Sequence, residues 1–193
     1  MQRKLPIMGL DGSLRNFGMA LMTLDVDTME IAVEELILTK TAKEKSKQVR
    51  ASSDNFNRAA DIAASIQSRL TTFRPQAVFV EVPSGGQSYA AVLGFGIVIG
   101  LYASILTPRP IEVSPAETKL ASVGVKNASK EEVMAWAFAK YPKAPWLTRK
   151  LKGEIVPIAD NEHLADSVAI AHAGIKTPAF AQALVVYRSM IAA

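Results

Sequence analysis

The sequence predicts a single-domain α/β protein, and two patterns carry that prediction. Three short apolar runs, at residues 5–11, 18–24 and 30–38, are separated by polar turns, which indicates an antiparallel three-stranded meander. Helix-like stretches then alternate with two further apolar runs, at residues 77–81 and 111–113, the order expected when helices cover a sheet. With 193 residues, 49% of them hydrophobic, the chain can form one sizeable core. We therefore expect one domain spanning residues 1–193.

Apolar periodicity and capping residues place the helices. An amphipathic helical pattern runs from residue 54 to about residue 70, and Ser53 or Asp54 is the expected N-cap of this helix. Ser129 and Glu132 have the spacing of a capping box. Expected helices are therefore residues 54–70, 90–106, one beginning at Pro115, 130–140, 161–174 and 178–190.

The longest apolar stretch, residues 90–106, is interrupted by Gly94, Gly96 and Gly100. It falls short of the roughly 20 residues that a membrane span requires. We interpret it as a buried helix whose glycines are sites of close packing. The glycines do not form a GxGxxG pattern, and no P-loop, HExxH or nucleophile-elbow motif is found in the sequence.

Composition excludes several classes of protein. The chain has no cysteine, which rules out disulfides, thiolate nucleophiles and cysteine-based metal sites. The formal net charge is +4, which favours a polyanionic partner. Two basic segments, residues 39–53 and 141–157, are expected to be exposed loops. The N-terminus lacks the pattern of a secretory signal, so we expect a cytoplasmic protein that does not bind a membrane.

Two strands and one helix each deliver a group suited to metal binding. Asp11 closes the first strand and Glu81 closes the fourth, while His163 and Asp166 fall three residues apart on one helix. Carboxylates that converge in a partly buried site repel one another, and a hard divalent cation such as Mg2+ or Mn2+ relieves that repulsion. Because a pair of such ions can hydrolyse phosphodiesters, these four residues are the candidate catalytic and metal-binding residues.

Each of these residues also has an ordinary structural explanation. Asp11 precedes a Gly-Ser turn, and capping of that turn accounts for an acid equally well. His163 alone is typical of a helix cap or a surface position. Glu81 and Asp166 favour a functional site more strongly. Glu81 ends a strand at the edge where open α/β sheets bind ligands, and Asp166 lies on a helix face expected to be buried.

Four stretches, in order along the chain, resemble RuvC-type Holliday junction resolvases. The segment GLDGSLRNFG, residues 9–18, looks like the opening motif of that family, and RPQAVFVE, residues 74–81, is similar to its second-acid strand. The segment KLASVGVKNASKEEV, residues 119–133, resembles the family's basic loop and helix start. The segment HLADSVAIA, residues 163–171, resembles its C-terminal acidic helix. The resemblance covers residues 7–173.

The resemblance implies an RNase H-like fold, which is a mixed five-stranded sheet of three antiparallel and two parallel strands flanked by helices. It also implies a Mg2+-dependent crossover junction endodeoxyribonuclease of DNA recombination and repair, with Mn2+ as a substitute and two ions in each active site. Asp11, Glu81 and Asp166 would be the metal-binding carboxylates, and His163 would bind metal or orient the nucleophilic water. The family acts as a homodimer whose two sites make paired symmetric nicks in a four-way junction.

The resemblance also points to DNA contacts. Lys119 and Lys130 match basic positions of the family that contact DNA or neutralise charge in the transition state. We add Lys126 from the same basic loop and Arg15 from the opening motif as expected DNA contacts.

Two features depart from the cellular members of the family. The aromatic residue that often follows the second acid is absent, and Tyr89 is its candidate replacement in DNA contact. The basic segments at residues 40–50 and 143–152 are also unusual. For these reasons the compact phage-type resolvases, which cut a wider range of branched DNA, are the nearer comparison, and a bacterial or phage-infected cell is the expected setting.

Two other functions are compatible with parts of the sequence. Asp11, Gly12 and Ser13 also resemble the phosphate-binding loop of actin-like and sugar-kinase ATPases, but those proteins need two such domains and this chain holds one. The other alternative is a module that binds branched DNA without cutting it. A missing carboxylate would identify such a module, and all the candidate acids are present.

Overall fold

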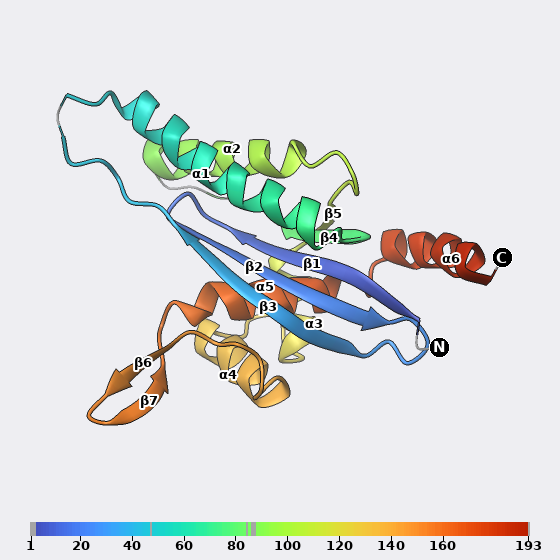
Figure 1. Ribbon diagram of the computed structural model, residues 1–193. Coiled ribbons are helices and arrows are strands. Elements are labelled where there is room, and N and C mark those ends of the chain that lie inside the picture. The colour runs from blue at the N-terminus through green and yellow to red at the C-terminus, as the bar shows by residue number, and fades with distance from the viewer. Residues whose placement is uncertain (1–2, 47, 84, 86–87, 193) are drawn as a thin grey trace.

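The computed structural model describes residues 3–46, 48–83, 85 and 88–192 (Figure 1). Five strands form one sheet in the order β3-β2-β1-β4-β5. β1 pairs antiparallel with β2, and β2 with β3, whereas β4 pairs parallel with β1, and β5 with β4. The strands are β1 (Lys4–Gly12), β2 (Asn16–Asp25), β3 (Ile31–Lys40), β4 (Ala77–Glu81) and β5 (Ile111–Val113). The predicted sheet of three antiparallel and two parallel strands is confirmed.

Six helices lie in the described part of the chain, and two layers of them enclose the sheet. In Figure 1, α1 and α2 cover one face, whereas α5, with α3 and α4 outside it, covers the other. The helices are α1 (Ala51–Thr72), α2 (Tyr89–Ala103), α3 (Pro115–Ser122), α4 (Lys130–Lys140), α5 (Asn161–Gly174) and α6 (Pro178–Ala192). None of those described is both long and apolar enough to cross a membrane. Parts of two expected turns and loops, at Lys47, Ser84, Gly86 and Gln87, lie outside the described residues.

The capping box predicted at Ser129 and Glu132 is present at the start of α4. The predicted start of α1 is wrong. This helix begins at Ala51, and the carboxylate of Asp54 accepts a hydrogen bond from the backbone N–H of Glu44 at 2.9 Å instead of capping the helix. Asp54 therefore ties the preceding loop to the first turn of α1.

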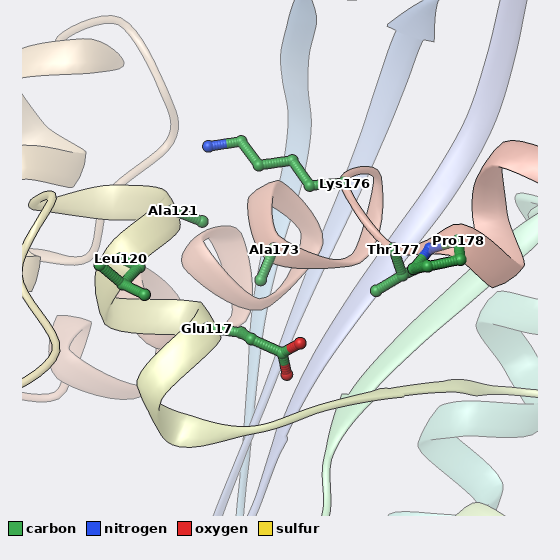
Figure 2. Close-up of a pocket in the computed structure, with 7 residues that line it drawn as sticks. All are labelled: Glu117, Leu120, Ala121, Ala173, Lys176, Thr177 and Pro178. Atoms are coloured by element: carbon green, nitrogen blue, oxygen red, sulfur yellow. The ribbon is translucent and has the colours of Figure 1, made fainter.

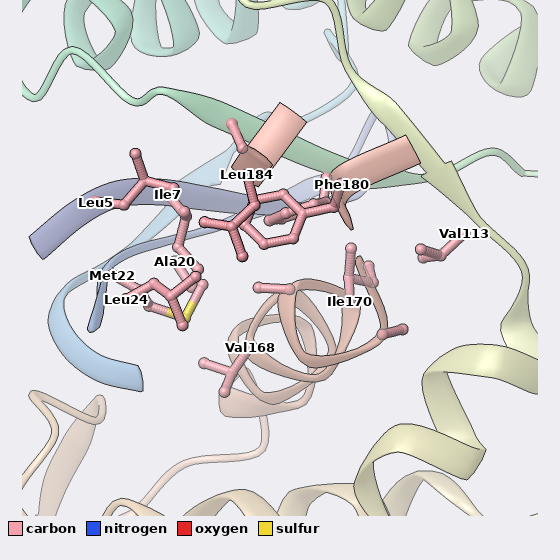
Figure 3. Packing of buried hydrophobic residues seen from close by; sticks show 14 of the residues in the cluster. Leu5, Ile7, Ala20, Met22, Leu24, Val113, Val168, Ile170, Phe180 and Leu184 are labelled. Atoms are coloured by element: carbon pink, nitrogen blue, oxygen red, sulfur yellow. The ribbon is translucent and has the colours of Figure 1, made fainter. Parts of the chain in front are cut away.

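The central helix of the fold is α5, which is buried between the sheet and the outer helices. Figure 3 shows Val168 and Ile170 of α5 pointing into a cluster that also contains Ile7 of β1 and Phe180 of α6. Because helices and the sheet surround it on several sides, apolar residues occupy most of its surface. This packing fixes the position of the α5 residues that carry the candidate chemistry.

The prediction that residues 90–106 form a buried helix is wrong. In α2 only Val98, Leu101 and Tyr102 are buried, whereas Val92 is 54% exposed and Ile99 is 42% exposed. Added Cβ atoms at Gly94, Gly96 and Gly100 would meet nothing within 4 Å, so these glycines are not close-packing sites within this chain. The physical reason is that α2 is an outer helix, and only one of its faces packs on α1 and the sheet (Figure 1).

The segment at residues 141–157, predicted as a loop, contains a β-hairpin. Strands β6 (Thr148–Leu151) and β7 (Glu154–Pro157) pair antiparallel. Lys152 and Gly153 between them have φ values of 49° and 94°, as a two-residue hairpin turn requires. The two turn residues are Lys-Gly, whereas the usual sequence of such a turn is Asn-Gly. The hairpin was not predicted because this signal is absent.

Candidate active site

Two of the candidate acids lie at the same edge of the sheet. Asp11 is the penultimate residue of β1, and Glu81 ends the parallel neighbouring strand β4. The hydroxyl of Thr118, in α3, donates a hydrogen bond to Oε2 of Glu81 at 3.0 Å. Burial raises the pKa of Glu81, and the nearby charge of Asp11 raises it further, against the hydrogen bond from Thr118 and the charge of Lys119. These opposing effects show that the two acids and Lys119 are electrostatic neighbours.

Small residues in the sheet let α5 approach this edge closely. Gly18 of β2 is the register partner of Asp11, and a Cβ atom at Gly18 would lie 2.4 Å from the backbone carbonyl oxygen of His163. A Cβ atom at Gly9 would lie 2.0 Å from the carbonyl oxygen of Ser167. Only glycine permits such an approach, so these two positions seat α5 against β1 and β2.

His163 is held between two side chains of the first strand pair. Its Nδ1 lies 2.8 Å from Oδ2 of Asp11, and its Nε2 lies 3.1 Å from Nδ2 of Asn16. The hydrogen bond to Asp11 raises the pKa of His163, while burial opposes that effect. The amide of Asn16, acting as a donor to Nε2, places the proton of the neutral ring on Nδ1, where it faces Asp11.

Asp166 lies one turn further along α5, in a less favourable environment for a charge. Burial raises the pKa of Asp166 to about 7, and repulsion by Asp11 is the next largest cause. Lys130 opposes the shift, whereas Glu162 and Glu81 add to it. Within the described residues, we find no hydrogen bond or ion pair to the Asp166 carboxylate. The site therefore contains a partly buried acid whose negative charge is not neutralised by a direct partner.

The four predicted residues are thus brought to one edge of the sheet, where they influence one another's protonation. No three histidine, aspartate or glutamate side chains among the described residues are already close enough together to hold a metal ion. The donor set nevertheless fits a hard divalent cation, because it consists of carboxylates that repel one another: Asp11 and Glu81 both raise the pKa of Asp166. A cation at this edge would remove that repulsion.

Two of the predicted basic residues adjoin these acids. Lys119 lowers the pKa of Glu81, and Lys130 lowers that of Asp166. Lys130 forms an ion pair with Glu162, and this contact raises the pKa of Lys130. Lys126 is exposed in the connection between α3 and α4, and no interaction in the structure brings it to the acids.

Arg15 and Tyr89 line one groove, although they are 74 positions apart in the sequence. The groove has a volume of about 450 Å3 and runs between the turn after β1, the start of α1 and the start of α2. Lys43 and Arg58 also line it, and the ring of Tyr89 is 82% exposed. An aromatic ring and several cations beside an exposed channel form a surface suited to a nucleic-acid strand.

Several site residues were not identified from the sequence. Asn16 contacts His163, and Thr118 contacts Glu81. Glu162 forms an ion pair with Lys130. Tyr102 lies beneath the end of β1, where its hydroxyl donates to the carbonyl oxygen of Leu10 at 3.4 Å. Asn16 falls inside the segment 9–18, whereas Glu162 directly precedes His163 and Thr118 directly precedes Lys119, so adjacency to a candidate residue was the available signal for these three. Tyr102 carried no such signal, because its role depends on how α2 packs on the sheet.

A second pocket lies away from these residues. Figure 2 shows it between α3, the end of α5 and the start of α6, with a volume of about 270 Å3. None of the candidate acids lines it. Its lining residues are Glu117, Leu120, Ala121, Ala173, Lys176, Thr177 and Pro178.

Comparison with known proteins places the fold. No family model matches the sequence, and no curated protein matches it. Among solved structures, Thermus thermophilus RuvC superposes with a TM-score of 0.62 at 23% identity, covering 88% of this chain and 92% of that one. The same protein in complex with a Holliday junction substrate gives a TM-score of 0.63 at the same identity and coverage. The yeast mitochondrial Holliday junction resolvase Ydc2 gives a TM-score of 0.59 at 14% identity, covering 96% of this chain and 82% of that one.

The protein therefore has an RNase H-like fold of mixed α/β architecture. Within that class, its architecture is similar to that of RuvC and the mitochondrial resolvase Ydc2.

Proposed function

We propose that this protein is a Mg2+-dependent endonuclease that resolves Holliday junctions and other branched DNA by paired symmetric nicks. The observation that carries the proposal is the meeting of Asp11, Glu81, His163 and Asp166 at one edge of a RuvC-like sheet. The similarity to a RuvC structure that contains a Holliday junction substrate supports branched DNA as the substrate class. The basic segments before α1 and before α5 support the wider substrate range of the phage-type enzymes.

Asp11, Glu81 and Asp166, with His163, are the residues that would hold two Mg2+ ions, or Mn2+ in their place. When bound, such ions supply an activated water and stabilise the leaving oxygen of a phosphodiester. The chain itself contributes the placement of the ligands. Gly18 allows His163 to reach Asp11, and the hydroxyl of Thr118 orients the carboxylate of Glu81.

The cations around the acids would position the DNA backbone. Lys119 and Lys130 stand beside Glu81 and Asp166, where they can neutralise a phosphate next to the scissile bond. Arg15 and Tyr89, in the groove between α1 and α2, would guide the strand that leaves the site. Lys126 would contact DNA further from the reaction, in keeping with its exposed position. The setting that we propose is the cytoplasm of a bacterial or phage-infected cell.

Paired nicks require two active sites, and we propose that α2 joins two copies of the chain. Its exposed face presents Val92, Leu93 and Ile99, and no charged residue occurs in the sequence between residues 82 and 108. Such an apolar face on an outer helix is typical of a protein interface. The adjoining groove has Arg109 and Glu112 on its lining, one charge of each sign, which suits pairing with a second copy.

The dimer is tested by Val92→Glu, because Val92 is 54% exposed and does not line the groove of Arg15 and Tyr89. Because a charge at the centre of an apolar interface is costly, sedimentation velocity should show a dimer for the wild-type protein and a monomer for this variant. Val185→Glu on α6, where the side chain is 66% exposed, is the matched control and should stay dimeric. A wild-type protein that sediments as a monomer in the presence of junction DNA would contradict this assembly.

The nuclease proposal is tested with a labelled synthetic four-way junction and a linear duplex of matching sequence. We expect paired symmetric nicks in the junction with Mg2+ or Mn2+, none with EDTA, and none in the duplex. Tight junction binding without nicks under any metal condition would instead indicate a branched-DNA binding module.

A further inference from the structure

We infer that the β6–β7 hairpin is a second DNA-binding element, which lies between two arms of the branched substrate and contacts the phosphates of both. This inference rests on the proposed function, because it concerns how the same substrate is held. The segment from residue 143 to residue 157 contains four cations and one acid. The cations are Lys143, Arg149, Lys150 and Lys152, and the acid is Glu154.

The hairpin projects from the body of the protein and is surrounded by solvent (Figure 1). Every residue of β6 is exposed, and in β7 only Val156 is partly covered. No ion pair involving Arg149, Lys150 or Lys152 is found among the residues that the structure describes. These three cations are therefore available to an external anion, and their desolvation would not break an internal contact.

The strand register places the cations on opposite sides of the ribbon. Arg149 pairs with Val156, and Lys150 pairs with Ile155, so the side chains of Arg149 and Lys150 lie on opposite faces. Lys152 lies in the turn at the tip. A ribbon that sits against one side of a single duplex needs cations on one face. Cations on both faces and at the tip suit a ribbon with phosphate backbones on both sides, as between two arms of a junction.

The base of the hairpin is fixed to the helix that carries the candidate catalytic residues. Asn161, the first residue of α5, is fully buried. Its Oδ1 accepts a hydrogen bond from the backbone N–H of Leu147 at 2.8 Å, and its Nδ2 donates to the carbonyl oxygens of Leu147 at 2.8 Å and Ile158 at 3.0 Å. Asn161 thus joins the two ends of the hairpin segment. His163 follows two residues later, so the hairpin has a defined position relative to the site.

A second basic segment starts at the same place. Lys40, at the end of β3, forms an ion pair with Asp160, the residue before α5. The loop that follows Lys40 carries Lys43, Lys45 and Arg50, and in Figure 1 it extends from the same end of the molecule as the hairpin. The two basic segments therefore diverge from one point near His163. This arrangement matches DNA arms that diverge from the point of cleavage.

The test is a hairpin variant, R149Q/K150Q/K152N, with asparagine at residue 152 because that residue tolerates the positive φ of the turn. The control is K4Q/K140Q/K176Q, which removes the same charge from the start of β1, the end of α4 and the connection between α5 and α6, away from the site. Affinities for the fluorescent four-way junction and for the linear duplex are measured in EDTA at several salt concentrations. Thermal unfolding of the hairpin variant should match that of the wild-type protein, since the substituted side chains are exposed.

We expect the hairpin variant to lose about tenfold or more in junction affinity, with a decrease of about 2 to 3 in the slope of log affinity against log salt. Its duplex affinity and the junction affinity of the control should change much less. Unchanged junction binding, or an equal loss for junction and duplex, would overturn the inference. Parallel cleavage assays with Mg2+ separate the two proposals. A wild-type protein that cuts junctions while the hairpin variant binds them normally refutes only the hairpin's role. A wild-type protein that never cuts, with junction binding that depends on the hairpin, refutes only the nuclease.

Discussion

The imidazole of His163 lies 2.8 Å from the carboxylate of Asp11, across 152 positions of sequence. This contact joins the end of β1 to the first turn of α5, and it exists because Gly18 leaves space for the His163 backbone. The geometry of the site therefore depends on a residue that carries no functional group.

Gly18→Ala should both destabilise the protein and impair cleavage. The added Cβ would lie 2.4 Å from the carbonyl oxygen of His163, so α5 must shift away from β2. Overpacking of this kind costs about 1 to 3 kcal/mol, which lowers the melting temperature by several degrees in a chain of this length. Thermal unfolding and junction cleavage measure the two effects. Gly96→Ala in α2, where an added Cβ meets nothing within 4 Å in this chain, is the control for stability and should leave the melting temperature unchanged or raise it slightly. Equal behaviour of the two variants would show that α5 is not seated by Gly18.

Asp166→Asn should stabilise the metal-free protein, and more so at high pH. The folded-state pKa of Asp166 is about 7, whereas its ordinary value is 3.8. Its contribution to stability is therefore fully present below about pH 4 and is lost as the pH rises through 7. Asparagine does not ionise, so the stability gain of the variant over the wild-type protein should be about 2 to 3 kcal/mol larger at pH 8 than at pH 5. Chemical unfolding in EDTA at both pH values measures this difference.

The same variant provides a measure of metal binding that does not depend on activity. Mg2+ should raise the stability of the wild-type protein at pH 8, because a ligand that binds only the folded state stabilises it. It should have little effect on Asp166→Asn. Asp61→Asn, at an exposed position of α1, is the control and should behave as wild type throughout. If the stability gain of Asp166→Asn does not depend on pH, then the charged carboxylate of Asp166 in the wild-type protein is not destabilised by burial and by Asp11.

Asn16→Ala should raise the Mg2+ concentration needed for half-maximal cleavage by about tenfold, with a smaller change in rate at saturating Mg2+. Asn16 contacts Nε2 of His163 at 3.1 Å and so keeps the Nδ1–H of the ring directed at the Asp11 carboxylate, and loss of a partner that orients a metal-binding carboxylate typically weakens metal binding by 10- to 100-fold. Titration of cleavage with Mg2+ gives this value. Asn57→Ala, on the exposed side of α1, should leave the titration unaltered. A normal Mg2+ requirement for Asn16→Ala would remove Asn16 from the site.

Lys130→Ala should weaken junction binding and decrease its salt dependence by about one unit of slope, as expected for one lost phosphate contact. Lys130 is held by Glu162 in the free protein, so Glu162→Gln should have the opposite effect and strengthen binding at low salt. Lys140→Ala, at the other end of α4, is the control. If Lys130→Ala and Lys140→Ala have the same salt slope as wild type, then Lys130 does not meet a phosphate.

Much of the fold could be predicted from the sequence because its signals are local. The apolar runs that became β1, β2, β3 and β4 alternate or are continuous as strands require, and the α4 capping box needs only two residues. The burial of α2 could not be predicted in this way. An apolar helix has the same composition whether its own chain or another molecule covers it, and the structure leaves much of this one exposed.

The candidate site could likewise be predicted where its signals are local and could not where they depend on packing. Asp11 and Glu81 were recognised because they end strands, and His163 and Asp166 because they share one helix face. The contact between His163 and Asp11 depends on the register of Gly18 and on the depth of α5, which are properties of the packed core. The hairpin was missed because its turn sequence is an unusual one and its strands have no buried face.

Cleavage at the edge that carries Asp11 is tested by comparing the wild-type protein with Asp11→Asn on the same labelled four-way junction. Asparagine keeps the size of the side chain but removes the charge that this account assigns to metal binding and to the His163 contact. With Mg2+, the wild-type protein should make paired symmetric nicks, and Asp11→Asn should bind the junction with similar affinity but leave it uncut. Nicks by Asp11→Asn at the wild-type rate would show that cleavage, if it belongs to this protein, is carried out elsewhere on the chain.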